Sequence, residues 1–157
     1  MSLSKERDMA IIIAVAIIEK DGNLLMVQEG REDVRGKWNV PAGHIKFGEN
    51  PIEAVVREAK EETGLDVEPT SFAGFQAFKD KSGMSVLRLN FNCKVKGGSF
   101  EEADEDILNV RWMSMDELKS LKEQGKLRSD RTWWSIKQLS GKRYPLEILD
   151  IIEGRYS

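Results

Sequence analysis

The stretch that decides the fold is residues 43–65, GHIKFGENPIEAVVREAKEETGL, a loop that turns into a short helix. Asn50 is a favoured N-cap, and Pro51 suits the first helical position because the amide proton it lacks is not needed there. Glu53 lies three residues after Asn50, from where its side chain can reach back to the cap amide. Gly64 tolerates the left-handed conformation that follows a helix end. The sequence therefore predicts both where this helix begins and where it ends.

The predicted helix has an apolar stripe beside an acidic flank. The stripe, which must face a core, consists of Ile52, Val55, Val56, Ala59 and Thr63. On the flank, Glu58, Glu61 and Glu62 follow the i, i+3, i+4 spacing, so their carboxylates project side by side. Arg57 is placed to pair with Glu61, and Glu53 with Arg57, which still leaves excess negative charge. A hard divalent cation, Mg²⁺ or Mn²⁺, would neutralise it; a merely solvated helix face is the alternative.

Composition restricts the class of protein and its partners. The chain has 157 residues, and we expect a single domain over 1–157. The net charge of −3 argues against long nucleic acid or an anionic membrane surface as the main partner. The apolar run 9–18 is shorter than the ~18 residues of a membrane span and lacks the features of a signal peptide. One cysteine, Cys93, suits a reducing cytoplasm, so we expect a cytoplasmic location.

Apolar and alternating runs on both sides of this helix predict strands. Met9 to Glu19 is rich in Ile, Val and Ala, and Asp21-Gly22 favours a hairpin turn that returns the chain as Leu24 to Gln28. Further strands are expected over 38–42, 66–79, 84–96 and 110–112, and helices after the N-cap Ser114 and over 131–139. This order of elements predicts an α/β three-layer sandwich.

Several residues outside the helix have two interpretations. Arg88 lies on the polar face of the strand 84–96 and points either into a substrate cleft or into solvent. Arg31 and Arg35 lie in a charged loop from which they could reach phosphates, although solvation is expected for at least one of them. Trp38 is expected to be buried in the core or at its rim rather than to stack on a base.

The spacing of charged and small residues in 43–65 resembles the signature of the Nudix hydrolases, which are MutT-like enzymes. The matching positions are Gly43, Glu49, Arg57, Glu58, Glu61, Glu62 and Gly64, with Ala59 and Leu65 in the two apolar positions. The resemblance implies a Nudix α/β/α sandwich with a mixed sheet. It also implies an enzyme that hydrolyses a diphosphate linked to another group, with Mg²⁺ or Mn²⁺ as cofactor.

The resemblance also assigns roles to the residues of the signature. Glu58 and Glu62 correspond to the primary metal ligands, Glu61 to a ligand that binds metal directly or through water, and Gly43 to a ligand through its backbone carbonyl. Arg57 is expected to orient the glutamates, which makes it part of the catalytic set.

Two further features complete the catalytic expectation. Glu49 would tie the loop to the helix. A base from a later acidic loop is common in the resembled family, and the candidates here are Asp106, then Glu105 and Glu102. The alternative is that this acidic loop is only solvated.

Segments outside the signature resemble one branch of the family, the NudJ-type bacterial phosphatases. They are WNVPAGH, LRLNF, DEDILNVRWMS, LRS and GKRYPLE. This resemblance implies a phosphatase that releases inorganic phosphate from nucleoside di- and triphosphates and from the diphosphate of the thiamin pyrimidine precursor.

The candidates for substrate binding are Arg88, Arg128, Arg143 and His44. Arg88, Arg128 and Arg143 could clamp a phosphate or small heterocycle together with Tyr144, although 143–145 could equally pin the C-terminal segment to the sheet. His44 either hydrogen-bonds to backbone in its loop or contacts a phosphate or nucleotide at the mouth of the site.

The expected partner is a small phosphorylated molecule, foremost a nucleotide, with no membrane or long nucleic acid involved. Within the hydrolase class, the alternatives are a MutT-like nucleotide pyrophosphatase and an ADP-ribose-type sugar-nucleotide pyrophosphatase. A non-catalytic ligand-binding module is a different class, and such modules typically lose metal-binding glutamates that this chain keeps. The sequence does not indicate the oligomeric state.

Overall fold

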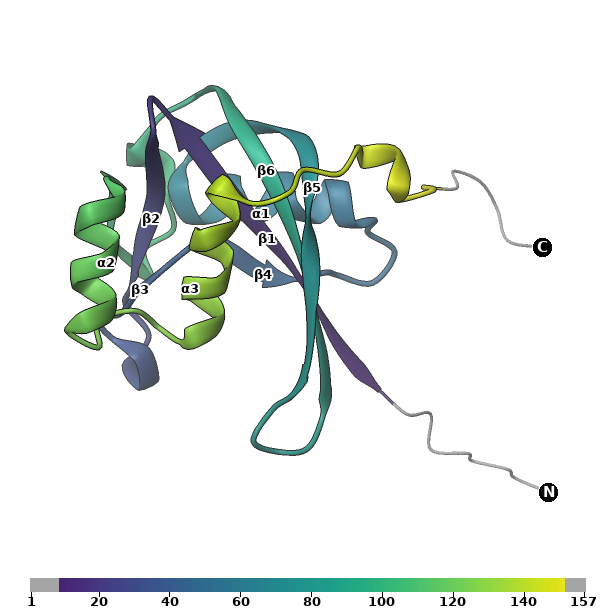
Figure 1. Cartoon of the computed structure of the whole chain (residues 1–157), viewed down its shortest axis with the longest axis horizontal. Helices are drawn as coiled ribbons and strands as arrows, with labels where there is room; N and C mark the ends of the chain where they lie inside the picture. The colour runs from purple at the N-terminus through teal and green to yellow at the C-terminus, as the bar shows by residue number, and fades with distance from the viewer. Residues whose placement is uncertain (1–8, 152–157) are drawn as a thin grey trace.

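A mixed β-sheet forms the middle layer of the molecule (Figure 1). The computed structural model describes residues 9–151, so both ends of the expected domain 1–157 lie outside the described residues. The strands are β1 (Ala10–Lys20), β2 (Asn23–Glu29), β3 (Trp38–Asn39), β4 (Ala42–His44), β5 (Leu65–Lys79), β6 (Ser85–Gly98) and β7 (Ile107–Met113). The α-helices are α1 (Pro51–Thr63), α2 (Met115–Glu123) and α3 (Asp130–Lys137). Short 3₁₀ turns occur at Glu32–Val34, Phe100–Glu102, Gln138–Ser140 and Leu146–Ile148.

The sheet is built around β1, in the order β3-β2-β1-β6-β5. β1 pairs in parallel with β6 from Ala10↔Ser85 to Ile18↔Cys93, whereas the other strand pairs are antiparallel. The predicted hairpin between β1 and β2 is confirmed, because Asp21 and Gly22 both have positive φ, 53° and 79°.

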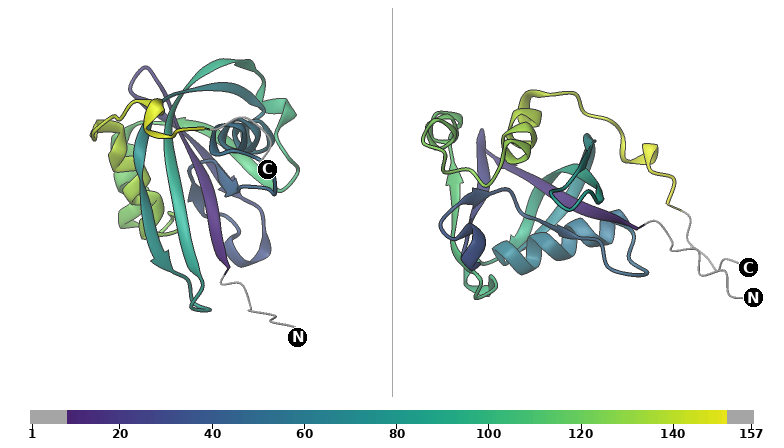
Figure 2. Two further views of the ribbon diagram at one scale, coloured as in Figure 1. Left: turned by 90° about the vertical axis from the view of Figure 1, so that its right-hand side faces the viewer. Right: turned by 90° about the horizontal axis from the view of Figure 1, so that it is seen from below.

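Helices cover both faces of this sheet, which confirms the predicted α/β/α sandwich (Figure 2). Successive residues of β1 alternate between the two faces. Ala14, Ala16 and Ile18 pack in one apolar cluster with the α1 residues Ala54, Val55 and Ala59. On the other face, Val15 and Ile17 pack with Leu118 of α2 and Ile136 of α3. The apolar stripe predicted on α1 therefore faces the core.

One strand prediction needs correction. The expected strand 38–42 is divided into β3, which pairs with β2, and β4, which pairs with β1. Pro41 lies between them and has no amide proton for a strand ladder. On the polar face of β6, which carries Arg88, Asn90 and Asn92 are buried, with exposed fractions of 0% and 3%. Asn90 can be buried beneath α3 because its side-chain Oδ1 accepts a hydrogen bond from Ser135 of that helix.

The other predicted helices and strands are present. Ser114 caps α2 in a capping box with Glu117. Trp38 is 7% exposed within the second apolar cluster, as expected of a core residue. Among residues 9–151, no helix is long and apolar enough to cross a membrane.

Candidate active site

The position of α1 is set by both of its ends and by its apolar stripe. Asn50 and Glu53 form the predicted capping box, with the Glu53 amide donating to Asn50 Oδ1 over 2.9 Å. Gly64 ends the helix with φ 77°, where a side chain would meet the backbone of Ser99. Because the stripe is fixed in the core, the acidic flank of α1 is held against β4 and the loop before β7.

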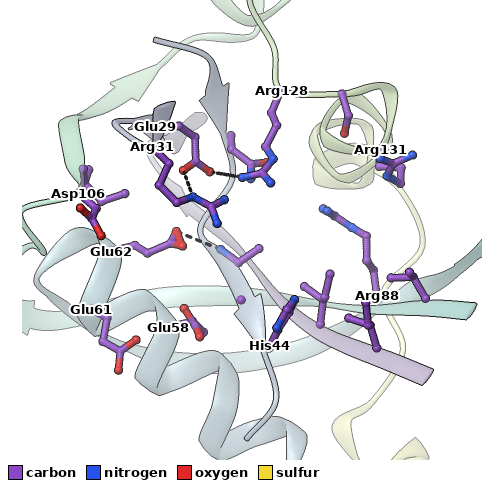
Figure 3. A pocket seen from close by; sticks show the side chains of 18 of the residues that line it. Glu29, Arg31, His44, Glu58, Glu61, Glu62, Arg88, Asp106, Arg128 and Arg131 are labelled. Carbon is purple, nitrogen blue, oxygen red and sulfur yellow. Dashed lines mark hydrogen bonds and ion pairs between the residues drawn. The ribbon is translucent and has the colours of Figure 1, made fainter. Parts of the chain in front are cut away.

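A cavity of about 560 Å³ lies beside this flank. Most of its carboxylates lie on one side and three guanidinium groups on the other, with Glu29 and Arg31 between them (Figure 3). We call these sides the acidic end (Glu58, Glu61, Glu62, Asp104 and Asp106) and the basic end (Arg88, Arg128 and Arg131). β4, with Ala42, Gly43 and His44, forms part of the wall.

Arg57 joins the residues of the acidic end to the preceding loop. Its Nη1 donates to Glu58 Oε1 over 2.8 Å and to Glu61 Oε2 over 3.0 Å, and its Nε donates to Glu49 Oε2 over 2.7 Å. The Glu49 carboxylate also accepts from the Lys46 amide, which ties the loop to the helix as expected. These hydrogen bonds with Arg57 lower the pKa of Glu49 and raise that of Arg57.

One predicted pair at the acidic end is wrong. Glu53 does not pair with Arg57, because its carboxylate accepts the Asn50 amide of the capping box over 3.3 Å. Arg57 instead uses its Nη2 on the carbonyl of His44, 2.9 Å away. Arg57 therefore positions β4 as well as the glutamates.

Glu58 and Glu62 carry carboxylates that the protein leaves short of compensating charge. Burial raises the pKa of Glu58, against the effect of Arg57, and Glu61 and Glu49 raise it further. Burial also raises the pKa of Glu62 well above its usual value, followed by repulsion from Glu29. The Ala42 amide donates to Glu62 Oε2 over 3.2 Å but does not compensate for this burial.

These residues fit a hard divalent cation. The Glu58 carboxylate lies directly against Gly43, where an added Cβ would overlap it. Arg57 contacts one oxygen of Glu58, which leaves Glu58 Oε2 for other contacts. Of the two Glu61 oxygens, Oε2 accepts from Arg57, and Oε1 lies 3.9 Å from Lys46 Nζ. Across the described chain, no three acidic, histidine or cysteine side chains are already arranged at metal-ligand spacing. Crowded, desolvated oxygen ligands are nevertheless the donor set that Mg²⁺ and Mn²⁺ prefer.

The acidic loop before β7 supplies part of the acidic end. Asp106 lines the cavity, as proposed from the sequence, and Asp104 lines it as well. The Asp104 amide donates to the Glu61 carbonyl over 2.8 Å, and burial followed by repulsion from Glu61 raises the pKa of its carboxyl. Glu102 instead contacts Lys60 Nζ at 2.5 Å, outside the cavity lining, and Glu105 is exposed.

Glu29 is a cavity residue that sequence reasoning placed in a surface loop. It is the last residue of β2 and is 5% exposed. Arg128 Nη1 lies 2.8 Å from Glu29 Oε1, and Arg31 Nε lies 3.8 Å from Glu29 Oε2 (Figure 3). Arg35 instead donates to the Gly30 carbonyl. The available signal was that Glu29 lies two residues after Val27, the end of a buried apolar run, and so points to the same face of the strand.

The structure brings some of the predicted substrate-binding residues together. Arg88, Arg128 and the exposed His44 line the cavity. Arg143 does not, because its guanidinium contacts the Leu139 carbonyl and Glu19.

Tyr144 has the structural role that was the alternative interpretation. It exchanges two backbone hydrogen bonds of 2.8 Å with Phe72 of β5. The expected cluster of Arg143 and Tyr144 with the cavity arginines therefore does not form, and Arg131 of α3 takes part in the basic end instead.

Comparison with known proteins gives consistent matches. A family model described as the NUDIX domain matches residues 9–133. Phosphatase NudJ from Escherichia coli is 32% identical over 142 residues, which cover 88% of this chain and 89% of that protein. The 8-oxo-dGDP phosphatase NUDT18 from Homo sapiens is 35% identical over 105 residues, 65% of this chain. The chain spans only 31% of the length of the first curated relatives that it matches.

A solved structure, a NUDIX hydrolase from Nitrosomonas europaea, superposes with a TM-score of 0.85 at 33% identity. The match covers 94% of this chain and 100% of that one. The similarity thus extends over most of the chain, and the residues matched by the family model include α1.

Proposed function

Because the chain belongs to the Nudix hydrolase family, we propose that it hydrolyses phosphoanhydride bonds in small nucleoside di- and triphosphates or related diphosphates. The observation that carries this proposal is the division of one cavity into an acidic and a basic end. A site of this kind can hold a cation and the anionic substrate that accompanies it.

The residues divide the work as follows. Glu58, Glu61 and Glu62, with the carbonyl of Gly43, would hold Mg²⁺ or Mn²⁺. When bound, such an ion would neutralise charge on the phosphates and lower the pKa of a bound water. Arg57 keeps the glutamates in place, and Asp106 accepts the proton of the attacking water, with Asp104 beside it as a further candidate. Arg88, Arg128 and His44 contact the substrate.

The relatives support a phosphatase acting on nucleotides. The names NudJ phosphatase and 8-oxo-dGDP phosphatase both describe release of phosphate. We extend this activity to the present chain, with the diphosphate of a thiamin pyrimidine as a further substrate to test. The partner is then a small molecule rather than a long nucleic acid. We expect the protein itself to be located in the cytoplasm.

The test is a product screen with purified protein in Mg²⁺ and in Mn²⁺. Substrates are nucleoside di- and triphosphates, 8-oxo-dGDP, ADP-ribose, dinucleoside polyphosphates and the thiamin pyrimidine diphosphate, with phosphate and pyrophosphate measured separately. We expect inorganic phosphate from nucleoside di- and triphosphates. Pyrophosphate release would favour the MutT-like alternative. Selective turnover of ADP-ribose would favour the sugar-nucleotide alternative, and binding without turnover would favour the non-catalytic module.

A further inference from the structure

The basic end contains a buried arginine that the described chain leaves unpaired. Arg88 extends from β6 into the cavity and is 6% exposed (Figure 3). Its Nη2 donates to Ser135 Oγ over 3.3 Å, but its Nε has no hydrogen-bond partner. No carboxylate within residues 9–151 lies at ion-pair distance from it. Burying a charge in this way is unfavourable unless a counter-charge arrives.

The packing behind Arg88 fixes this orientation. Ser135 and Asn90 are both completely buried. The Ser135 hydroxyl donates to Asn90 Oδ1 over 2.7 Å, so an oxygen lone pair remains to accept from Arg88. Asn90 Nδ2 in turn lies 3.3 Å from the carbonyl of Gly74. The free Nε–H of Arg88 is thus held in place by the fold rather than by a ligand.

The neighbours of Arg88 are also cations. Burial, followed by repulsion from Arg131 and Arg128, lowers the pKa of Arg88 to about 10, so it stays protonated at neutral pH. Arg128 is paired with Glu29, whereas the Arg131 guanidinium lies 4.3 Å from the centre of the Phe78 ring. Glu29 therefore offsets the charge of Arg128, whereas Arg88 and Arg131 add positive charge at this end without an ion-pair partner in the described chain.

We propose that the basic end binds a second phosphate of the substrate, separate from the phosphoanhydride at the acidic end. The substrate class is then a small diphosphate that carries a further phosphate, for example a nucleoside 5′-diphosphate phosphorylated on the 3′-hydroxyl. Guanidinium groups match phosphate oxygens in number and geometry, whereas an uncharged base would leave Arg88 without a counter-charge. This inference rests on the proposed function.

Kinetics with paired substrates test the inference. Phosphate release in Mg²⁺ is measured for ADP and for adenosine 3′-phosphate 5′-diphosphate, with wild type, Arg88→Met, Arg131→Gln and the control Arg111→Met. Arg111 is an exposed arginine of β7 outside the cavity lining. We expect wild type to prefer the 3′-phosphorylated substrate in kcat/KM by about 10- to 100-fold, the usual effect of charge-assisted hydrogen bonds.

Both basic-end variants should lose that preference, and Arg111→Met should keep it. Arg131 is exposed, so Arg131→Gln remains informative if Arg88→Met folds poorly. Equal kcat/KM for the two substrates in wild type would overturn the proposal. So would an equal loss on both substrates in Arg88→Met, because that result would assign the arginine to the scissile diphosphate.

A measurement without turnover separates this inference from the proposed function. In chelator, inorganic phosphate is titrated into ¹⁵N-labelled protein while the Nε–H resonance of Arg88, assigned by its loss in Arg88→Met, is followed. A saturable shift would support the anion site even if no substrate is hydrolysed. No shift would overturn the site. A shift without the kinetic preference would overturn the proposed substrate class, because the site would then bind free phosphate and not a phosphate of the substrate.

Discussion

The acidic and basic ends of the cavity are organised in opposite ways. At the acidic end, neighbouring residues of one helix and its preceding loop are joined by Arg57, which contacts Glu49, Glu58 and Glu61 within 3.0 Å. At the basic end, Arg88 and Arg131 come from β6 and α3, distant in the chain, and have no carboxylate partner within the described residues. Apart from Asp104 and Asp106 of the later loop, local contacts hold the acidic end, whereas tertiary packing holds the basic end.

This difference shows what each end lacks. At the acidic end, Arg57, Lys46 and Arg31 do not offset the burial of the carboxylates, which raises the pKa of Glu58 and Glu62. The basic end has buried positive charge with hydrogen-bond capacity left over. A cation at the first and an anionic substrate between the two would satisfy both.

The largest effect is expected from Glu62→Gln at the acidic end. The amide keeps the shape of the side chain and an oxygen for the Ala42 amide but loses the charge that would hold a cation. We expect kcat/KM to fall by about 10²-fold or more, with little change in the melting temperature. Glu53→Gln, on the exposed capping side of the same helix, is the matched control and should stay close to wild type. Near-normal turnover in Glu62→Gln would refute the ligand assignment.

A smaller loss is expected from Arg57→Lys. Lysine keeps the charge, but its single ammonium cannot reach Glu49, Glu58, Glu61 and the His44 carbonyl together. We expect a loss of about 10- to 100-fold in kcat/KM, typical of residues that orient metal ligands. Steady-state kinetics across a Mg²⁺ series should show a raised requirement for the metal. The same kinetics in Arg111→Lys should match wild type; an unaffected Arg57→Lys would show that Arg57 does not position the site.

The smallest expected effect is on the free energy of unfolding, and its sign should differ between substitutions at the two ends. Arg57→Met should lower the free energy of unfolding, because it leaves the carboxylates around it unpaired. Arg88→Met should leave it unchanged or raise it by about 1–4 kcal/mol, because an unpaired buried charge is replaced by an apolar chain of similar length. Denaturant unfolding in chelator measures both. Strong destabilisation by Arg88→Met would show that this arginine is a structural residue of the core.

The acidic end could be predicted from the sequence because its geometry is local. The Asn50–Glu53 capping box, the stop at Gly64 and the i, i+3, i+4 carboxylates all follow from helix rules, and the structure contains each of them. The Glu53–Arg57 pair does not form, because Arg57 contacts Glu49, Glu58 and Glu61 instead while Glu53 accepts the Asn50 amide.

The basic end could not be predicted in the same way. Glu29 and Arg128 meet across 99 positions of sequence, and nothing near either residue indicates the other. The alternation of β6 identified the face that carries Arg88 but not α3, which buries it. Arg143 has the same chemistry as Arg131 but lies outside the cavity, so residue type alone could not choose between them.

The most direct test of the account is a calorimetric titration of Mn²⁺ and Mg²⁺ into wild type, Glu62→Gln and Glu53→Gln, with turnover measured in parallel with and without chelator. We predict saturable binding in wild type and Glu53→Gln, weakened or lost binding in Glu62→Gln, and no turnover in chelator. Binding that is unchanged in Glu62→Gln, or turnover that persists in chelator, would contradict the claim that these carboxylates gather around a divalent cation.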